Sequence, residues 1–144
     1  MTGLPKIQIG PVTLDGVKPV FILGPCVIEG ESFLREVAAQ IADMAGRHNF
    51  RWVLKASYDK ANRSSIRSFR GLGLEAGCAL LAEVGAWHGV PVTTDVHAPA
   101  EAEKAAEWID LLQIPAFLCR QTDLITAAAA TGRAVNVKKG QFMA

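Results

Sequence analysis

Short apolar segments alternate with helical patterns along most of the chain, and this alternation restricts the possible folds more than any other feature. The first such segment, Val20-Phe21-Ile22-Leu23, is apolar throughout, which is typical of a strand covered on both faces in a parallel sheet. Similar strand segments follow at 52–55, 92–96, 111–114 and 134–138, and helical patterns separate the segments at 32–45, 74–87, 100–108 and about 122–130. This alternation indicates a βα series, in which the strands lie parallel.

The apolar residues of the first helical pattern have the spacing of a helix with one buried face. They are Phe33, Val37, Ile41 and Met44, with Leu34 and Ala38 beside them. Gly46 follows at the place where a helix C-cap would stand. We therefore expect the helix to end at Gly46.

Residues 7–15 alternate apolar and polar side chains around Gly10-Pro11, which predicts a small β-hairpin that plugs one end of the domain. Polar residues then gather where the strand segments end, at Cys26, Lys55, Asp95, Gln113 and Lys138. Such a concentration is typical of the catalytic edge of a (β/α)8 TIM barrel. The expected fold class is α/β, with residues 1–144 in a single domain.

The chain is short for a complete barrel, which takes about 250 residues and eight strands. The fifth strand segment ends near Lys138 of 144 residues. Five strands left open would expose two sheet edges and much apolar surface. We therefore expect the N-terminal part of a barrel, up to about its fifth strand, within a longer enzyme, and no activity from these residues alone.

Composition excludes several classes of protein. Hydrophobic residues make up 50% and charged residues 20%, as in ordinary globular domains, and the net charge of +1 disfavours general nucleic-acid binding. No apolar run approaches the roughly 20 residues of a membrane span, and the N-terminus lacks the pattern of a signal peptide. Three widely spaced cysteines argue against a disulfide framework. We expect a cytoplasmic protein.

Residues 55–73, here called the basic loop, join the second strand segment to the second helical pattern. The loop holds five cationic side chains against one carboxylate, Asp59, together with several serines. Arginine offers phosphate a planar fork of donors and lysine supplies a compact charge, so the loop suits phosphate and carboxylate groups. The alternative is a solvated basic loop without a ligand.

The order of residues in this loop is more specific than its composition. Lys-Ala-Ser-x-Asp-Lys-Ala-Asn-Arg-Ser-Ser, with Phe-Arg-Gly behind it, resembles the signature of the 3-deoxy-D-manno-octulosonate 8-phosphate synthase family. Ile-Pro-Ala-Phe-Leu-Cys-Arg-Gln-Thr-Asp (114–123) and Asn-Val-Lys-Lys-Gly-Gln-Phe (136–142) resemble the same family. The resemblance implies a transferase of lipopolysaccharide biosynthesis that condenses phosphoenolpyruvate with D-arabinose 5-phosphate.

Within the basic loop, the resemblance implies substrate-binding roles for Lys55, Ser57, Lys60, Asn62, Arg63 and Ser64. Lys55 would lie near the carboxylate of phosphoenolpyruvate, and Lys60, a candidate catalytic residue, between the two substrates. Arg63 and Ser64 would hold the sugar phosphate and Asn62 the sugar hydroxyls. The alternative for the two lysines is an ordinary surface position.

Beyond the loop, the resemblance implies that Gln113, Ala116, Phe117 and Lys138 contribute to the phosphoenolpyruvate pocket. Phe117 would wall the pocket, although a buried aromatic residue is more often plain core. Arg120 resembles an arginine that reaches across a subunit interface to the sugar phosphate, which implies a homo-oligomer, a tetramer in the family.

Asp95 is the second candidate catalytic residue beside Lys60. It ends the third strand segment, where a carboxylate can support other site residues or accept a substrate hydroxyl. A purely structural role is the alternative.

Cys26 decides the expected cofactor. The family divides into members with Asn at this place, which work without metal, and members with Cys, which bind a divalent ion; Gly-Pro-Cys-Val-Ile-Glu follows the Cys pattern. The resemblance thus implies a divalent metal such as iron, manganese or zinc, whose remaining ligands come from the second half of the barrel. A catalytic metal needs about three protein ligands, and His97 and Cys119 are the other candidates in this chain. A lone cysteine is otherwise often an inert thiol, and Cys78 is expected in the core.

Two other functions remain open. One is 3-deoxy-arabino-heptulosonate 7-phosphate synthase, which uses erythrose 4-phosphate and tends to carry a Lys-Pro-Arg-Thr-type run where this chain has Lys-Ala-Asn-Arg-Ser-Ser. The other is a half-barrel that binds a phosphorylated ligand or a partner chain without catalysis.

Overall fold

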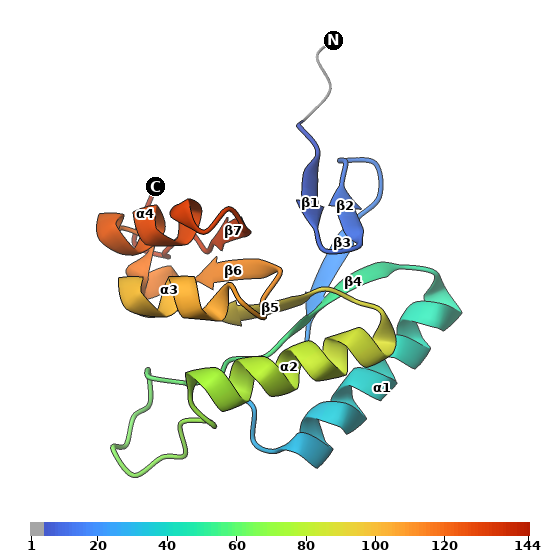
Figure 1. Ribbon diagram of the computed structural model, residues 1–144, viewed down its shortest axis with the longest axis horizontal. Helices are drawn as coiled ribbons and strands as arrows, with labels where there is room; N and C mark the ends of the chain where they lie inside the picture. The colour runs from blue at the N-terminus through green and yellow to red at the C-terminus, as the bar shows by residue number, and fades with distance from the viewer. Residues whose placement is uncertain (1–4) are drawn as a thin grey trace.

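All five predicted strands form one parallel sheet, and they follow one another in the sheet in chain order (Figure 1). The computed structural model describes residues 5–144. The strands are β3 (Val20–Leu23), β4 (Arg51–Lys55), β5 (Val92–Asp95), β6 (Leu111–Ile114) and β7 (Ala134–Val137). A sheet whose order never reverses is wound in one direction, as in a barrel wall, and lacks the reversal of a doubly wound sheet.

Along the chain, one helix follows each of the first four strands of the sheet, and in space the helices form one outer layer. They are α1 (Glu31–His48), α2 (Leu74–His88), α3 (Pro99–Ala105) and α4 (Thr122–Ala130), with the short 3-10 turn η1 (Ala116–Leu118) after β6. Each α-helix packs against the next, α1 on α2, α2 on α3 and α3 on α4 (Figure 1). Neighbouring helices in sequence are therefore neighbours in space, and the predicted partial (β/α) barrel is confirmed.

A hairpin of β1 (Ile7–Ile9) and β2 (Val12–Leu14) precedes the sheet, as predicted. Ile9 is buried against Val53 and Leu111, two residues of the face opposite the helices. The Arg51 guanidinium donates to the backbone carbonyls of Thr13 (2.8 Å) and Lys18 (2.7 Å). The hairpin is thus fixed over the inner face of the sheet near the amino ends of the strands, and the opposite end stays open.

The buried face of α1 differs from the predicted one. Leu34, Ala38 and Ala45 are buried, whereas Phe33 and Met44 are 41% and 43% exposed. Positions 34, 38 and 45 have helical spacing too, so periodicity alone did not distinguish two faces about 100° apart.

The predicted end of α1 was also wrong. The helix continues through Gly46 to His48 and ends at Asn49, whose φ of 51° is left-handed. Asn is the residue other than glycine that most readily takes this conformation. The third main helix, predicted to reach Trp108, ends at Ala105.

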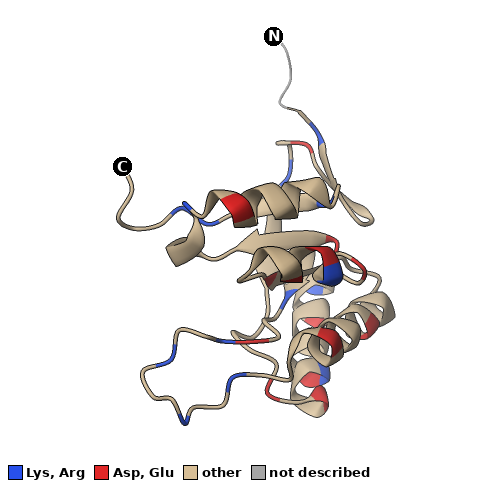
Figure 2. Cartoon of the chain, turned by 60° about the vertical axis from the view of Figure 1, so that its left-hand side comes forward, with Lys and Arg blue, Asp and Glu red and all other residues tan. Residues whose placement is uncertain are grey.

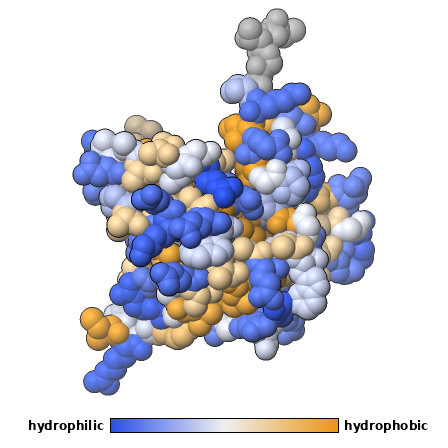
Figure 3. Space-filling view, viewed as in Figure 1, coloured by the Kyte–Doolittle hydropathy of each residue, from blue (hydrophilic) through white to orange (hydrophobic). Residues whose placement is uncertain are grey.

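Strand β3 was predicted to be covered on both faces and is not. Phe21 and Ile22 are 43% and 40% exposed, because β3 forms one edge of the sheet. On β7, at the other edge, Val137 is 42% exposed, while β6, which has a neighbouring strand on each side, is buried throughout. Apolar residues also reach the surface beside the hairpin (Figure 3). Both edges are open, as expected for part of a barrel.

Candidate active site

A pocket of about 500 Å³ lies at the carboxyl ends of the strands. Its lining includes these predicted site residues: Cys26, Lys55, Ser57, Lys60, Asn62, Asp95, Ala116, Phe117 and Lys138. A larger surface groove, of about 810 Å³, lies between α3 and α4, but its described lining residues include one cation, Arg133, and two glutamates. The smaller pocket is lined by three lysines and is therefore the better candidate site for an anionic ligand.

Strand register explains why residues far apart in sequence meet here. Asp95 of β5 is paired with Gln113 of β6, and Gln113 with Asn136 of β7. In a parallel sheet, paired residues share a face. Lys55, at the end of β4, reaches the same face and bonds Asp95.

Asp95 is the centre of the polar contacts at the floor of the pocket. Its Oδ2 accepts a hydrogen bond from Ser57 Oγ (2.5 Å) and lies 3.2 Å from Lys55 Nζ, while its Oδ1 accepts from Gln113 Nε2 (2.7 Å). Lys55 Nζ also donates to Ser57 Oγ (2.9 Å) and to the carbonyl of Cys26 (3.2 Å). The lysine charge and the carboxylate are thus held in fixed positions.

The pKa of Asp95 reflects opposing influences. Burial raises it, but the charge of Lys55 and the hydrogen bonds from Ser57, Gln113 and Lys55 together outweigh burial, so the pKa lies below its ordinary value. Asp95 is therefore an anion at neutral pH. The stability that its ionised form contributes is present above the ordinary carboxyl pKa and is lost as pH falls through the lowered one.

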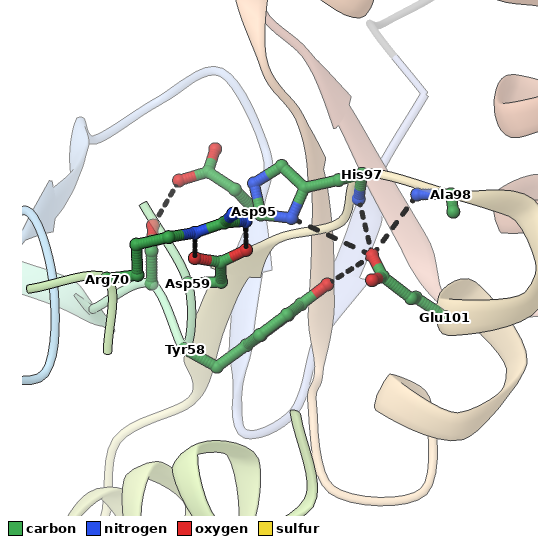
Figure 4. A network of polar contacts seen from close by, with 8 residues as sticks. Tyr58, Asp59, Arg70, Asp95, His97, Ala98 and Glu101 are labelled. Carbon is green, nitrogen blue, oxygen red and sulfur yellow. Dashed lines mark hydrogen bonds and ion pairs between the residues drawn. The ribbon is translucent and has the colours of Figure 1, made fainter. Parts of the chain in front are cut away.

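A second group of contacts joins the base of the basic loop to α3 (Figure 4). Glu101 accepts hydrogen bonds from Tyr58 Oη (2.6 Å) and from the backbone N–H groups of His97 (2.9 Å) and Ala98 (3.1 Å). The His97 ring lies edge-on to Tyr58, with ring centroids 5.5 Å apart. Burial, then the Glu101 contact, raises the pKa of Tyr58 far above its ordinary value, so the phenol remains a donor.

The basic loop is closed at its base and exposed at its tip. Asp59 forms an ion pair with Arg70, whose Nε donates to Asp59 Oδ1 (2.8 Å), and the Lys60 N–H donates to the Arg70 carbonyl (2.6 Å). The hydrogen bond and charge of Arg70 lower the pKa of Asp59. Ile66, at the tip, is 101% exposed. Figure 2 shows the loop projecting from the molecule with its Lys and Arg positions spread along it.

The remaining predicted site residues do not line this pocket. Arg63 and Ser64 are exposed on the tip of the basic loop, and Arg120 is exposed after η1. Gln113 is 4% exposed, with its amide bonded to Asp95 and to Asn136 (2.9 Å). Phe117, by contrast, belongs to the residues that line the pocket, and its side chain is 60% exposed, so the core interpretation of this residue was wrong.

No site role was predicted for Asp59 or Asn136, although Asp59 lines the pocket. His97, predicted only as a possible metal ligand, also lines the pocket. A signal for Asn136 was available, because it precedes Lys138 by two residues on a strand and so lies on the same face.

The described residues do not form a metal centre by themselves. Within residues 5–144 no group of three His, Cys, Asp or Glu side chains could hold an ion. Cys26 is exposed at the pocket, but Cys119 is buried and its Sγ lies 3.2 Å from Met143 Sδ. A metal at Cys26 requires ligands from outside these residues.

Several known proteins are similar to this chain in sequence. Three similar proteins are each named 2-dehydro-3-deoxyphosphooctonate aldolase, an alternative name for the synthase that the basic loop resembles. The relative from Laribacter hongkongensis is 58% identical over 128 residues, covering 88% of this chain and 45% of the relative. Those from Fusobacterium nucleatum (51% identical; 96% of this chain, 50% of the relative) and Synechococcus sp. (56%; 90% and 46%) are comparable.

The chain spans about half the length of the curated relatives it matches. Within the described residues, no helix combines the length and apolar character needed to cross a membrane. The model of the DAHP synthetase I family matches residues 6–144, almost the whole sequence. The chain therefore belongs to the DAHP synthetase I family.

Proposed function

We propose that the protein containing this chain is a cytoplasmic synthase of lipopolysaccharide biosynthesis. It condenses phosphoenolpyruvate with D-arabinose 5-phosphate and water to give 3-deoxy-D-manno-octulosonate 8-phosphate and phosphate. The observation that carries the proposal is the pocket lined by Lys55, Lys60 and Lys138, in which Lys55 is held against the carboxylate of Asp95. The names of the relatives support the same reaction.

The reaction brings together two phosphorylated molecules that repel each other. C3 of phosphoenolpyruvate forms a bond to the aldehyde carbon of the sugar, whose oxygen takes up a proton. Water then adds to C2 and releases one proton, which balances the proton taken up by the aldehyde oxygen. The C2–O bond to phosphate breaks, and the remaining hydroxyl proton leaves with the phosphate as the C2 carbonyl forms. Fixed cations offset the repulsion between the substrates, and correct positioning supplies much of the remaining acceleration.

We assign a separate role in substrate binding to each of the lysines that line the pocket. Lys55 has three acceptors around its Nζ, which hold the ammonium where it can bind the carboxylate of phosphoenolpyruvate. Lys138, at the end of β7, faces the phosphate, and Lys60 lies between the substrates. Ser57 and Gln113 hold Asp95, which orients Lys55 and the substrate hydroxyls.

Arg63 and Ser64 are proposed to bind the sugar phosphate. Replacing Arg63 with alanine in the full-length protein is expected to raise the KM for arabinose 5-phosphate about 10- to 100-fold, because it removes a charge-assisted hydrogen bond of about 1.5–3 kcal/mol. The KM for phosphoenolpyruvate should change little. Steady-state kinetics with each substrate varied in turn measures both values, with Arg67→Ala as the matched control on the same loop. Equal losses for both substrates would contradict the role of Arg63.

Arg120 is proposed to complete the site of a neighbouring subunit in a homo-oligomer, a tetramer by analogy with the family. Its exposure outside the pocket of its own chain supports this role.

A divalent metal is proposed with Cys26 as one ligand, the others lying outside the described residues. Full-length Cys26→Asn protein is expected to lose its bound metal, because the amide replaces a thiolate ligand. Metal per protein chain is measured by plasma mass spectrometry after dialysis. The control is Cys119→Ser, which alters a buried thiol outside the pocket and should keep the metal. An unchanged metal content in Cys26→Asn removes Cys26 from the metal site.

The reaction itself is tested by phosphate release from phosphoenolpyruvate in the presence of either arabinose 5-phosphate or erythrose 4-phosphate. The proposal predicts release with arabinose 5-phosphate and little with erythrose 4-phosphate. The reverse preference indicates the heptulosonate synthase. Binding of phosphoenolpyruvate with no phosphate release in the presence of either sugar indicates a phosphate-binding protein that does not catalyse the reaction.

A further inference from the structure

Three polar side chains form a continuous row across β5, β6 and β7. Asn136 Nδ2 donates to Gln113 Oε1 (2.9 Å), and Gln113 Nε2 donates to Asp95 Oδ1 (2.7 Å). The three residues are paired neighbours in the sheet register, so the row follows from the backbone pairing. It ends on the same carboxylate that holds Ser57 and Lys55.

The middle member of this polar row can face either way. A glutamine amide has a donor end and an acceptor end of nearly equal shape. With its oxygen toward Asp95 it would place two acceptors against each other, and with its NH₂ toward Asp95 it stabilises the anion. Gln113 is 4% exposed, so water has little access to replace a lost partner. The Asp95 anion attracts the NH₂ end, and Asn136, by donating to the Gln113 oxygen, favours the same orientation and holds the other end of the amide in place.

We propose that Asn136 is a positioning residue of the active site: by donating to Gln113 Oε1 it keeps the Gln113 NH₂ directed at Asp95, and so fixes Asp95 and Lys55 for the reaction. The proposal rests on the proposed function, since it assigns Asn136 to that pocket. Asn136 is absent from the residues that line the pocket, and it acts through Gln113 rather than on the substrate.

The arrangement requires a hydrogen-bond donor at position 136, which the Asn136 amide supplies. Aspartate has the same size but no donor at neutral pH, so its carboxylate would compete with Asp95 for the Gln113 NH₂ and leave an acceptor facing an acceptor on one side of the amide. Alanine removes the donor to Gln113 Oε1, so the Gln113 amide is held by Asp95 alone and is less firmly fixed. The aspartate variant should therefore impair the reaction more than the alanine variant.

The test uses the full-length protein and compares Asn136→Asp and Asn136→Ala with the wild type. We expect kcat to fall about 10- to 100-fold, more for the aspartate, because small misplacements of catalytic groups cost factors of this size. The KM values for both substrates should change less than threefold, because the residues that touch the substrates remain. The control is Val137→Ala, which shortens an exposed side chain of the same strand outside the row and should keep the wild-type kcat.

A double-mutant cycle separates positioning from general damage to β7. If Asn136 acts through Gln113, then Asn136→Ala should lower kcat little further in a Gln113→Ala background. The proposal is overturned if the kcat losses of Asn136→Ala and Gln113→Ala multiply in the double variant. It is also overturned if Asn136→Ala and Asn136→Asp both keep the wild-type kcat, or if they change KM alone. The cycle relies on the alanine variants, so it remains decisive if Asn136→Asp does not fold.

The outcomes also distinguish this inference from the proposed function. Wild-type protein that releases no phosphate with arabinose 5-phosphate overturns the function and, with it, the role of Asn136. Active wild-type protein with unaffected Asn136 variants overturns only the role of Asn136.

Discussion

Replacing Lys55 with methionine is expected to lower kcat/KM for the proposed condensation about 10³-fold. The ammonium is held by the Cys26 carbonyl, Ser57 and Asp95, so its charge is already in place when an anionic substrate enters. A preorganised charge in a partly dry pocket is worth about 10²–10³ in rate, and lost substrate binding adds to this. Steady-state kinetics of the full-length variant measures the effect.

The neighbouring charge of Lys139 provides the matched control. Lys139 is exposed and does not line the pocket, so Lys139→Met should retain activity within about threefold. If both variants lose activity equally, the effect comes from overall charge and not from the position of Lys55.

The same Lys55 substitution should also lower stability, by about 3 kcal/mol, because it leaves the Asp95 carboxylate largely buried without its cation. The pKa of Asp95 should rise in the variant, since the charge of Lys55 is the main influence that lowers it. The stability that the wild type loses on acidification through the lowered Asp95 pKa should then be smaller in the variant. Thermal unfolding followed by circular dichroism between about pH 3 and pH 7 measures both effects.

Replacing Gly24 with alanine is expected to destabilise the protein by more than about 4 kcal/mol or to prevent folding. A Cβ at this position would lie 1.9 Å from the Lys55 carbonyl oxygen, and the φ of 148° is one that residues with side chains rarely adopt. The neighbouring atom is backbone of β4, so relief requires the chain after β3, which leads to Cys26, to move away from Lys55. Soluble yield and thermal unfolding of the full-length variant measure the loss.

Gly46 offers the matched control for Gly24. It lies within α1, and nothing stands within 4 Å of a Cβ added there. Gly46→Ala should therefore stabilise the protein by about 0.5–1 kcal/mol, since alanine favours a helix interior over glycine. Destabilisation by Gly46→Ala would mean that α1 ends at Gly46, as the sequence pattern had indicated.

The order of strands and helices could be predicted from the sequence, because it rests on local patterns. Apolar runs such as Val20–Leu23, helical spacing from Leu74 onward and alternation in the hairpin each reflect which faces of one element are apolar. The errors arose where two local solutions were equally good. Phe33 and Leu34 both begin a plausible buried face of α1, and only contact with α2 and the sheet selected Leu34.

The residues of the candidate site also fall into two groups, those whose position followed from the sequence pattern and those that remain predictions. Lys55, Asp95 and Lys138 were predicted because they follow strands whose carboxyl ends meet at one edge. Arg63 and Arg120 remain predictions, since the described chain leaves both exposed outside the pocket.

By itself, the sequence determined the βα order, the position of the hairpin and the strand ends that carry the polar residues, because each depends on the chemistry of a few adjacent residues. The tertiary structure alone decided which polar groups are partners. The row from Asn136 through Gln113 to Asp95 joins three strands whose register places these residues side by side. Such contacts depend on pairing between distant segments, and a pattern within any one segment does not contain that pairing.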